Sequence, residues 1–313
     1  MIVPSRELRK LFSSKMWMTR RAFNEVLGEF LISLKSSEHA EIKSYRQHTQ
    51  DYVKKLSQSQ QINVTEDYES GSIPEDSIAF HRIDGLILAD SYYGFSSKQF
   101  RKDLLSADAN PKVIAHFIET NSGGGEAWYL DVVAETMKGL SKPVVAHYEN
   151  VAASAAIYLT INADRIFAST RNDTIGSIGT MVSFIDIVGI LEKFGAQYVE
   201  EYSNHSDLKN KKFNDLLDGK PEQYITEELD PLAEQFLLEV AGARKLKAKL
   251  DLSAEPKDRH PLFRGETFDT GASIEIGLID GQMLLEDALM EAYQMGINNK
   301  DNAIKLNQVF TQL

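Results

Sequence analysis

The chain has 313 residues and a formal net charge of −12, a length that allows one large domain or two small ones. An acidic surface argues against coating nucleic acid, and the absence of cysteine excludes disulfides, thiolate metal sites and a cysteine nucleophile. No apolar run reaches the roughly 20 residues of a membrane span, and residues 1–21 mix charged and apolar residues without the apolar core of a signal peptide. We therefore expect a soluble, cytoplasmic protein.

The first part of the chain differs from the rest in charge. Residues 1–60 hold 11 Lys and Arg against 6 Asp and Glu, a net charge of +5. Apolar residues at three- and four-residue spacing predict a helix over 19–47, so we expect a helical N-terminal arm over 1–55 that includes Trp17. Its basic face would dock an acidic partner or remain solvated. The polar stretch 56–76 is predicted to be a linker.

From residue 77 onward, short apolar segments alternate with helical periods. We predict strands over 78–88, 113–118, 143–148, 165–168, 180–185 and 197–202, and helices over 97–105, 127–140, 153–162 and 188–194. Further helices are expected over 221–247, 270–277 and 284–295. This alternation is typical of an α/β domain with a mainly parallel sheet and crossover helices, here over 77–313.

One junction between a strand and a helix is rich in glycine. The segment from Asn121 runs through Gly123, Gly124 and Gly125 before the next helical pattern begins. Glycines allow a ligand to approach the backbone, and free N–H groups at a helix start bind an oxyanion or a phosphate. The Gly-Lys-Ser/Thr of a phosphate-binding loop is missing. A plain flexible turn is the alternative interpretation.

A second junction places a serine between alanines. Ser154 lies in the sequence Val-Ala-Ala-Ser-Ala-Ala, after the strand over 143–148. At a helix start its hydroxyl is uncrowded, and the N–H of Ala155 is available to a developing oxyanion. The alternative interpretation is a small-residue helix that packs closely on its neighbour.

A nucleophilic serine also requires a base, and two candidates follow in the chain. His205 with Asp207 is the first, in a polar loop. The second is a lysine after the strand over 197–202, where Lys209, Lys211 and Lys212 follow one another closely. Such a run is otherwise typical of a solvated surface.

Four ordered segments within residues 78–281 resemble peptidase family S49, which includes signal peptide peptidase A and phage prohead proteases on the ClpP/crotonase fold. Residues 121–127 are similar to its Asn/Asp-Ser-Pro-Gly-Gly turn, with Gly123 at the proline position. Residues 152–156 resemble its nucleophile turn, with alanines where glycines are common. Residues 167–179 contain a Gly-Ser-Ile-Gly turn, and residues 264–281 resemble the closing segment that ends in Gly-Leu-Ile-Asp.

The resemblance implies a serine endopeptidase with a Ser-Lys dyad. Ser154 would be the nucleophile and Lys209 the general base, with Lys211 as a rival, and Ser177 would hold the lysine amine. A base must be neutral, whereas a free lysine has a pKa of about 10.4, so burial among apolar side chains is expected to lower the pKa of this lysine.

The same resemblance implies an oxyanion hole made by the N–H groups of Gly125 and Ala155, with Gly124 in place of Gly125 if the alignment shifts by one residue. No metal or cofactor is required for this chemistry.

The absence of an evident membrane anchor and the N-terminal arm favour the phage type. We therefore expect a homo-oligomeric prohead protease, a ring or dome, that cleaves capsid, scaffold or portal proteins in the host cytoplasm or the prohead interior. A soluble bacterial protease like the signal peptide peptidases is the alternative within the family. A crotonase-fold acyl-CoA enzyme, which would not need Ser154 and Lys209, and a non-catalytic scaffold are the alternatives from other classes.

Overall fold

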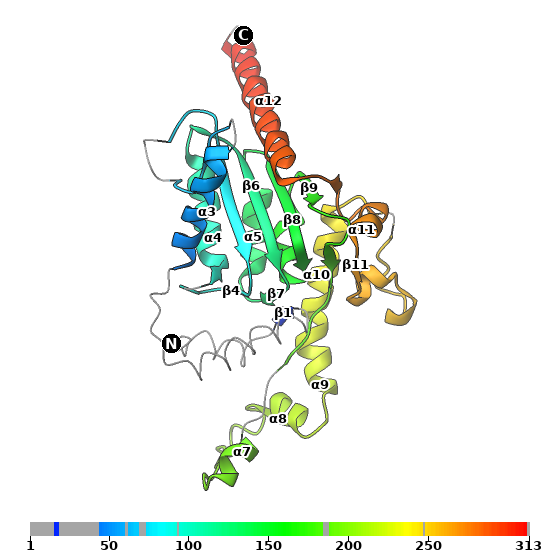
Figure 1. Cartoon of the computed structure of the whole chain (residues 1–313). Coiled ribbons are helices and arrows are strands. Elements are labelled where there is room, and N and C mark those ends of the chain that lie inside the picture. Colours follow the sequence, from blue (N-terminus) through cyan, green and yellow to red (C-terminus); the bar gives the residue numbers. More distant parts are fainter. Residues whose placement is uncertain are drawn as a thin grey trace.

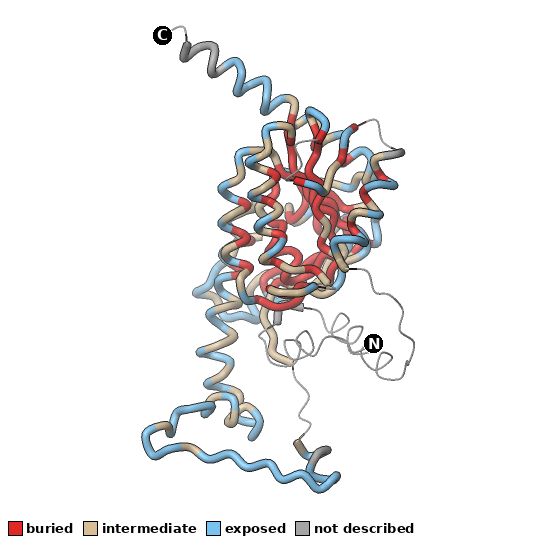
Figure 2. The backbone as a smooth tube through the Cα atoms, turned by 90° about the vertical axis from the view of Figure 1, so that its left-hand side faces the viewer, coloured by how far each residue is buried: buried red, intermediate tan, exposed pale blue. Residues whose placement is uncertain are grey.

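The computed structural model of the protein describes residues 16–18, 44–59, 62–68, 73–92, 94–183, 188–246 and 248–311. A mainly parallel sheet lies at its centre with helices on both faces (Figure 1), and the buried residues concentrate along this sheet (Figure 2). The predicted fold class, a parallel α/β sheet with crossover helices, is therefore confirmed. Most of the predicted N-terminal helix over 19–47 lies outside the described residues.

The main sheet has the strand order β11-β10-β8-β6-β3-β2. These strands are β2 (Val64–Thr65), β3 (Ser77–Asp84), β6 (Val113–Ser122), β8 (Val144–Ala153), β10 (Thr174–Gly176) and β11 (Thr267–Phe268). Strand β9 (Arg165–Ala168) pairs with β8 and also with β12 (Gly281–Gln282). Neighbours are parallel except for β10 and β11, so the carboxyl ends of β3, β6 and β8 lie at one edge of the sheet.

A second, smaller sheet has the order β1-β7-β4-β5. It contains β1 (Met16–Met18), β7 (Gly124–Glu126), β4 (Ile87–Leu88) and β5 (Phe95–Ser96). Two sequence-based expectations are corrected here. Residues 16–18, expected within a helical arm, form a strand, and the glycines after β6 form strand β7 rather than a helix start, since the next helix begins only at Leu130.

Helices cover both faces of the main sheet. They are α3 (Tyr45–Ser59), α4 (Ser97–Ala109), α5 (Leu130–Lys138), α6 (Ala155–Thr160), α10 (Asp230–Ala243), α11 (Thr270–Ile276) and α12 (Leu285–Thr311). Along β8, Ala146 and Tyr148 face a core that α4, α5, α6 and α10 complete, whereas Val145 faces a second core built with α3 and α12. This alternation is the two-residue period of a strand buried on both faces.

The stretch 56–76, predicted to be a linker, contributes to the fold. Helix α3 continues to Ser59, and β2 pairs in parallel with β3. Ile62 and Val64 are buried in the second core. Part of this stretch therefore packs with the sheet.

Residues 188–225 leave the body of the molecule as an extension, which carries α7 (Val188–Lys193), α8 (Lys211–Leu217) and α9 (Glu222–Tyr224) (Figure 1). The strand predicted over 197–202 is wrong: these residues are irregular and almost all exposed, because no strand of the chain pairs with them in the described structure. Residues 180–183 of the predicted strand 180–185 also belong to no strand element. The helix predicted over 221–247 is divided by a π-helical turn, Ile225–Leu229, between α9 and α10.

Among the described residues, no helix combines the length and the apolar character that crossing a bilayer requires.

Candidate active site

Ser154 lies at the tight turn between β8 and α6. Its backbone angles, φ 57° and ψ −118°, are sparsely populated by residues other than glycine and cost about 1–3 kcal/mol. Its N–H donates to the carbonyl of Gly176 at 2.8 Å, and its own carbonyl accepts from the N–H of Tyr158 at 3.1 Å. A strained strand-to-helix turn displays the nucleophilic serine of α/β-hydrolases, so this backbone is suited to a nucleophile.

Ser177 follows the neighbouring strand. Strand β10 runs parallel to β8 with Gly176 opposite Ala153, so the residue after Gly176 lies next to Ser154. Ser177 also has a positive φ, 56°, and its N–H donates to the carbonyl of Glu266 at 2.8 Å. The two predicted serines are thus held at adjacent strand ends, each in an unusual backbone conformation.

The glycine strand β7 lies beside this turn, because α6 packs against β7. At Gly125 a Cβ atom would lie 1.9 Å from the carbonyl oxygen of Ile87, so the close approach of β4 alone requires glycine there. The N–H of Gly124 donates to Ser122 Oγ at 3.1 Å. In this arrangement the Gly124 N–H is engaged within the chain, and Gly125 lies between β4 and β1.

The candidate bases lie away from the serine turn. Lys209 is exposed, in a turn just before α8, and its N–H donates to the carbonyl of Ser206 at 3.0 Å. His205 is exposed on the same extension, and Lys211 forms an ion pair with Asp215 within α8. Figure 1 shows α8 well away from the sheet. One chain therefore brings together Ser154, Ser177 and the glycine strand, but not the lysines or His205.

A polar cluster that the sequence analysis did not single out lies at the same edge of the sheet. Glu119 is buried and accepts hydrogen bonds from Tyr52 Oη at 2.6 Å and Arg82 Nε at 3.1 Å. Burial raises the pKa of Glu119, against the opposing effect of these two donors. The cluster ties α3 to β3 and β6. Its only sequence signal was a glutamate directly after the apolar run 113–118.

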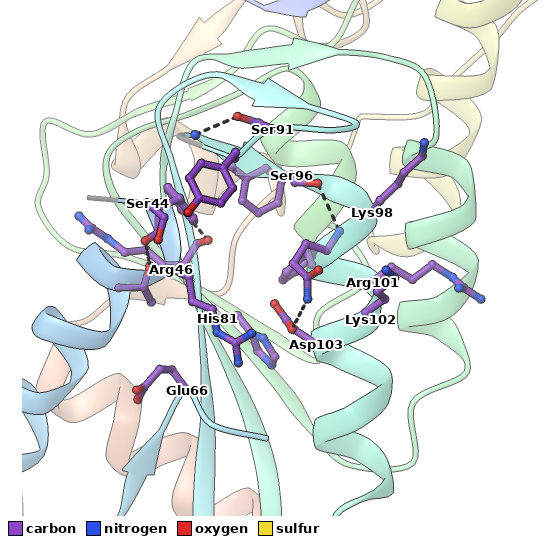
Figure 3. A pocket seen from close by; sticks show the side chains of 18 of the residues that line it. Ser44, Arg46, Glu66, His81, Ser91, Ser96, Lys98, Arg101, Lys102 and Asp103 are labelled. Atoms are coloured by element: carbon purple, nitrogen blue, oxygen red, sulfur yellow. Dashed lines mark hydrogen bonds between the residues drawn. The ribbon is translucent and has the colours of Figure 1, made fainter. Parts of the chain in front are cut away.

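A cavity of about 770 Å³ opens between α3, β3 and α4 (Figure 3). Charged side chains around it include Arg46, Glu66, Lys98, Arg101 and Asp103. None of the predicted catalytic residues lines it. The cavity is therefore separate from the serine turn.

From the wall of this cavity, where Tyr68 and His81 lie, a chain of buried polar groups connects two strands and a helix. His81 Nδ1 lies 3.1 Å from Tyr68 Oη, and its Nε2 lies 3.0 Å from His116 Nδ1. His116 Nε2 in turn lies 3.4 Å from Asp108 Oδ1. Burial lowers the pKa of both histidines, and the charge of His116 lowers that of His81 further. Both are therefore held in the neutral form.

Comparison with known proteins gives a family match. The sequence model of peptidase family S49 matches residues 137–296. A signal peptide peptidase SppA of Enterococcus faecium is 25% identical over 198 residues, 62% of this chain and 55% of that protein. Protease 4 of Haemophilus influenzae is 26% identical over 207 residues, 64% of this chain and 32% of that protein. The chain thus spans about half the length of the first relative and a third of the second.

Among solved structures, an enoyl-CoA hydratase/carnithine racemase from Magnetospirillum magneticum has a TM-score of 0.41 and 14% identity, over 74% of this chain and 79% of that one. A variant of the membrane-bound stomatin-specific protease 1510-N has a TM-score of 0.39 and 13% identity, over 70% of this chain and 86% of that one.

Proposed function

The chain belongs to peptidase family S49, and from this membership we propose that it is a serine endopeptidase with Ser154 as its nucleophile. The observation that carries the proposal is the backbone of Ser154, a strained turn between β8 and α6. The turn stands next to Ser177 and to the glycine strand β7. Acyl transfer requires this combination of a nucleophile with backbone N–H donors nearby.

In the proposed reaction a neutral lysine amine takes the proton of Ser154 Oγ while that oxygen attacks the carbonyl carbon of the scissile peptide bond. The N–H groups of Ala155 and Gly125 stabilise the oxyanion of the tetrahedral intermediate. The proton passes to the leaving amine as the C–N bond breaks, which leaves an acyl ester on Ser154. Water then attacks the ester carbonyl and gives a proton to the same lysine. The lysine returns this proton to Ser154 Oγ as the ester C–O bond breaks, which releases the acid and restores the free serine and the neutral amine.

We infer that the base, Lys209, acts on Ser154 of a second copy of the chain. In one chain Lys209 is exposed on the extension, whereas a lysine base requires burial. The extension also exposes large apolar side chains, with Phe194 85%, Leu208 73% and Val199 69% exposed. Large exposed apolar side chains on a projecting segment are typical of an interface. Packing against a neighbour would bury both these side chains and Lys209, with Ser177 positioned to hold its amine.

Mixing two inactive variants tests this arrangement. Ser154→Ala and Lys209→Ala should each abolish peptide cleavage, because members of one catalytic unit are not additive. If the dyad joins two copies, a refolded or subunit-exchanged mixture should regain about a quarter of wild-type activity, the fraction of sites with both groups intact in a random assembly. A mixture as inactive as its components would place the dyad within one chain or the base elsewhere.

Lys211→Ala and His205→Ala are the matched controls on the same extension. Both should retain most activity, since neither supplies the base in the proposed reaction. Lys209→Arg should be inactive, because a guanidinium stays protonated at working pH. An active Lys209→Ala together with an inactive His205→Ala would replace the Ser-Lys dyad by a Ser-His pair.

For the substrate we propose capsid, scaffold or portal proteins of an assembling phage head, cleaved in the host cytoplasm or the prohead interior. The similarity to SppA supports a second class equally well, the signal peptides named by that relative. Incubating wild type and Ser154→Ala with both classes, with cleavage sites identified by mass spectrometry, separates them. Thioester turnover that survives Ser154→Ala would instead indicate an acyl-CoA enzyme.

A further inference from the structure

Strand β7 has a different partner on each of its two edges. On one edge β4 runs parallel to it, with Ile87 opposite Gly125. On the other edge β1 runs antiparallel, with Met16 opposite Glu126, Trp17 opposite Gly125, and Met18 opposite Gly124. A segment from near the start of the chain therefore occupies an edge that would otherwise be free to pair with an extended peptide.

The occupied edge belongs to the candidate active site. Strand β7 begins two residues after Ser122, which pairs with Ala152, two residues before Ser154. Helix α6, which starts directly after Ser154, packs against β7. Ser154 itself is only 1% exposed. A peptide whose carbonyl is to reach Ser154 must pass close to the edge that β1 covers.

We propose that Met16–Met18 is an internal competitor of the peptide substrate: it pairs with the peptide-binding edge of β7 and must leave before a substrate strand can bind there. This inference rests on the proposed peptidase function. Antiparallel pairing uses main-chain groups, so a substrate of almost any sequence can exchange with β1. A three-residue strand is a weak partner by itself, but its covalent connection gives it a high effective concentration at β7.

The competition predicts a split between kinetic constants. If only the molecules with an open edge bind peptide, the apparent KM equals the intrinsic KM divided by the open fraction, while kcat is unchanged. Trp17→Pro removes an N–H and disfavours the strand, so it should lower KM at least about fivefold with little change in kcat. Trp17→Ala keeps the N–H and should have a clearly smaller effect. Equal kinetics for Trp17→Pro and wild type would overturn the proposal.

A disulfide provides the converse test, because the chain has no cysteine of its own. Residues directly opposite in an antiparallel pair have Cα atoms about 4.5–5.5 Å apart, which is within disulfide range. Met16 and Glu126 are such a pair, so Met16→Cys combined with Glu126→Cys should form a cross-link under oxidation. Glu126 accepts a hydrogen bond from the N–H of Ala89, so the single Glu126→Cys variant sets the reference activity. The oxidised double variant should lose at least about tenfold in activity and recover on reduction.

The outcomes separate this inference from the proposed function. Cross-link formation is measured by mass and by mobility without reductant, independently of activity. A cross-linked protein that cleaves as fast as its reduced form, or a cross-link that does not form, overturns the competition while leaving Ser154-dependent proteolysis intact. If neither the wild type nor any variant cleaves peptide in a Ser154-dependent way, the proposed function fails, and the competition fails with it.

Discussion

At the residue scale, Gly125 is a described glycine that leaves no room for a side chain. A Cβ atom there would lie 1.9 Å from the carbonyl oxygen of Ile87, a backbone atom that cannot move away alone. Gly125→Ala should therefore separate β4 from β7, with a loss of unfolding free energy of about 3 kcal/mol or more and loss of activity. Urea denaturation and a peptide assay measure both.

The matched control for Gly125 is Gly242 in α10, where an added Cβ meets nothing within 4 Å. Gly242→Ala should stabilise the protein by about 0.5–1 kcal/mol, because alanine is the better helix former. If the two variants had similar stability, the close approach of β4 to Gly125 would be refuted.

Ser154 provides a second prediction at this scale, since its backbone is strained. With φ 57° the position suits glycine, so Ser154→Gly should raise the unfolding free energy by about 1 kcal/mol while abolishing cleavage. Ser154→Ala removes the same hydroxyl but keeps a Cβ atom, so it should abolish cleavage without that gain. Thermal or urea unfolding of the wild type and the two variants measures this difference. An equal gain in unfolding free energy for both variants would mean that the hydroxyl, not the backbone, is the source of instability.

At the element scale, the buried histidines of β3 and β6 link stability to pH. Burial holds His81 and His116 neutral in the folded state, with pKa values below the ordinary 6.5, whereas both are protonated in the unfolded chain at lower pH. The unfolded state then binds more protons, so stability is complete above about pH 6.5 and is lost as pH falls. Each histidine contributes at most about 1.4 kcal/mol per pH unit.

Replacing one histidine tests this dependence. His81→Gln retains polar atoms near Tyr68 and His116 but does not titrate, so its unfolding free energy should fall less steeply than that of the wild type between pH 7 and pH 5. Hydrogen bonds from His116 and Ser141 outweigh burial and lower the pKa of Asp108 to about 2, so that carboxylate stays charged throughout the interval. Parallel curves for the two proteins would exclude His81 as a source of the pH dependence.

At the scale of the whole molecule, the extension over 188–225 is the part that a single chain does not explain. We predict that the protein assembles in solution, with a mass above the 35.2 kDa of one chain. Phe194→Glu combined with Leu208→Glu should yield a folded, inactive monomer. Leu105→Glu, on the exposed side of α4 and therefore on the body, is the control and should leave the assembly intact. Light scattering and a peptide assay give the two readouts. A fully active wild-type protein of 35.2 kDa would contradict the prediction.

The sequence predicts the central strands of the body better than it predicts the extension. Strands buried on both faces read as continuous apolar runs, so the sequence predicts β9 at its observed ends and β6 and β8 with shifted ends. The single strand predicted over 78–88 is divided into β3 of the main sheet and β4 of the smaller sheet, and β10 was not predicted. The segment over 197–202 contains Tyr198, Val199 and Tyr202, residue types that favour strands, yet it forms no strand. Composition indicates only the capacity to pair, and no strand is available to pair with it within the described chain.

For the candidate site, the order of the motifs and the family resemblance pointed to Ser154, Ser177 and the glycine segment, and the structure brings these three together. Parallel strands bring consecutive carboxyl ends to one edge, so the chain sequence itself implies that these residues meet. Three features could be seen only in the tertiary structure. The close approach of β4 requires glycine at position 125, and β1 covers one edge of β7. Lys209 lies away from Ser154. Each feature depends on whether segments far apart in the chain pair with each other. The pattern of residues determines which face of a helix or strand is apolar, but it does not determine which other element packs against that face.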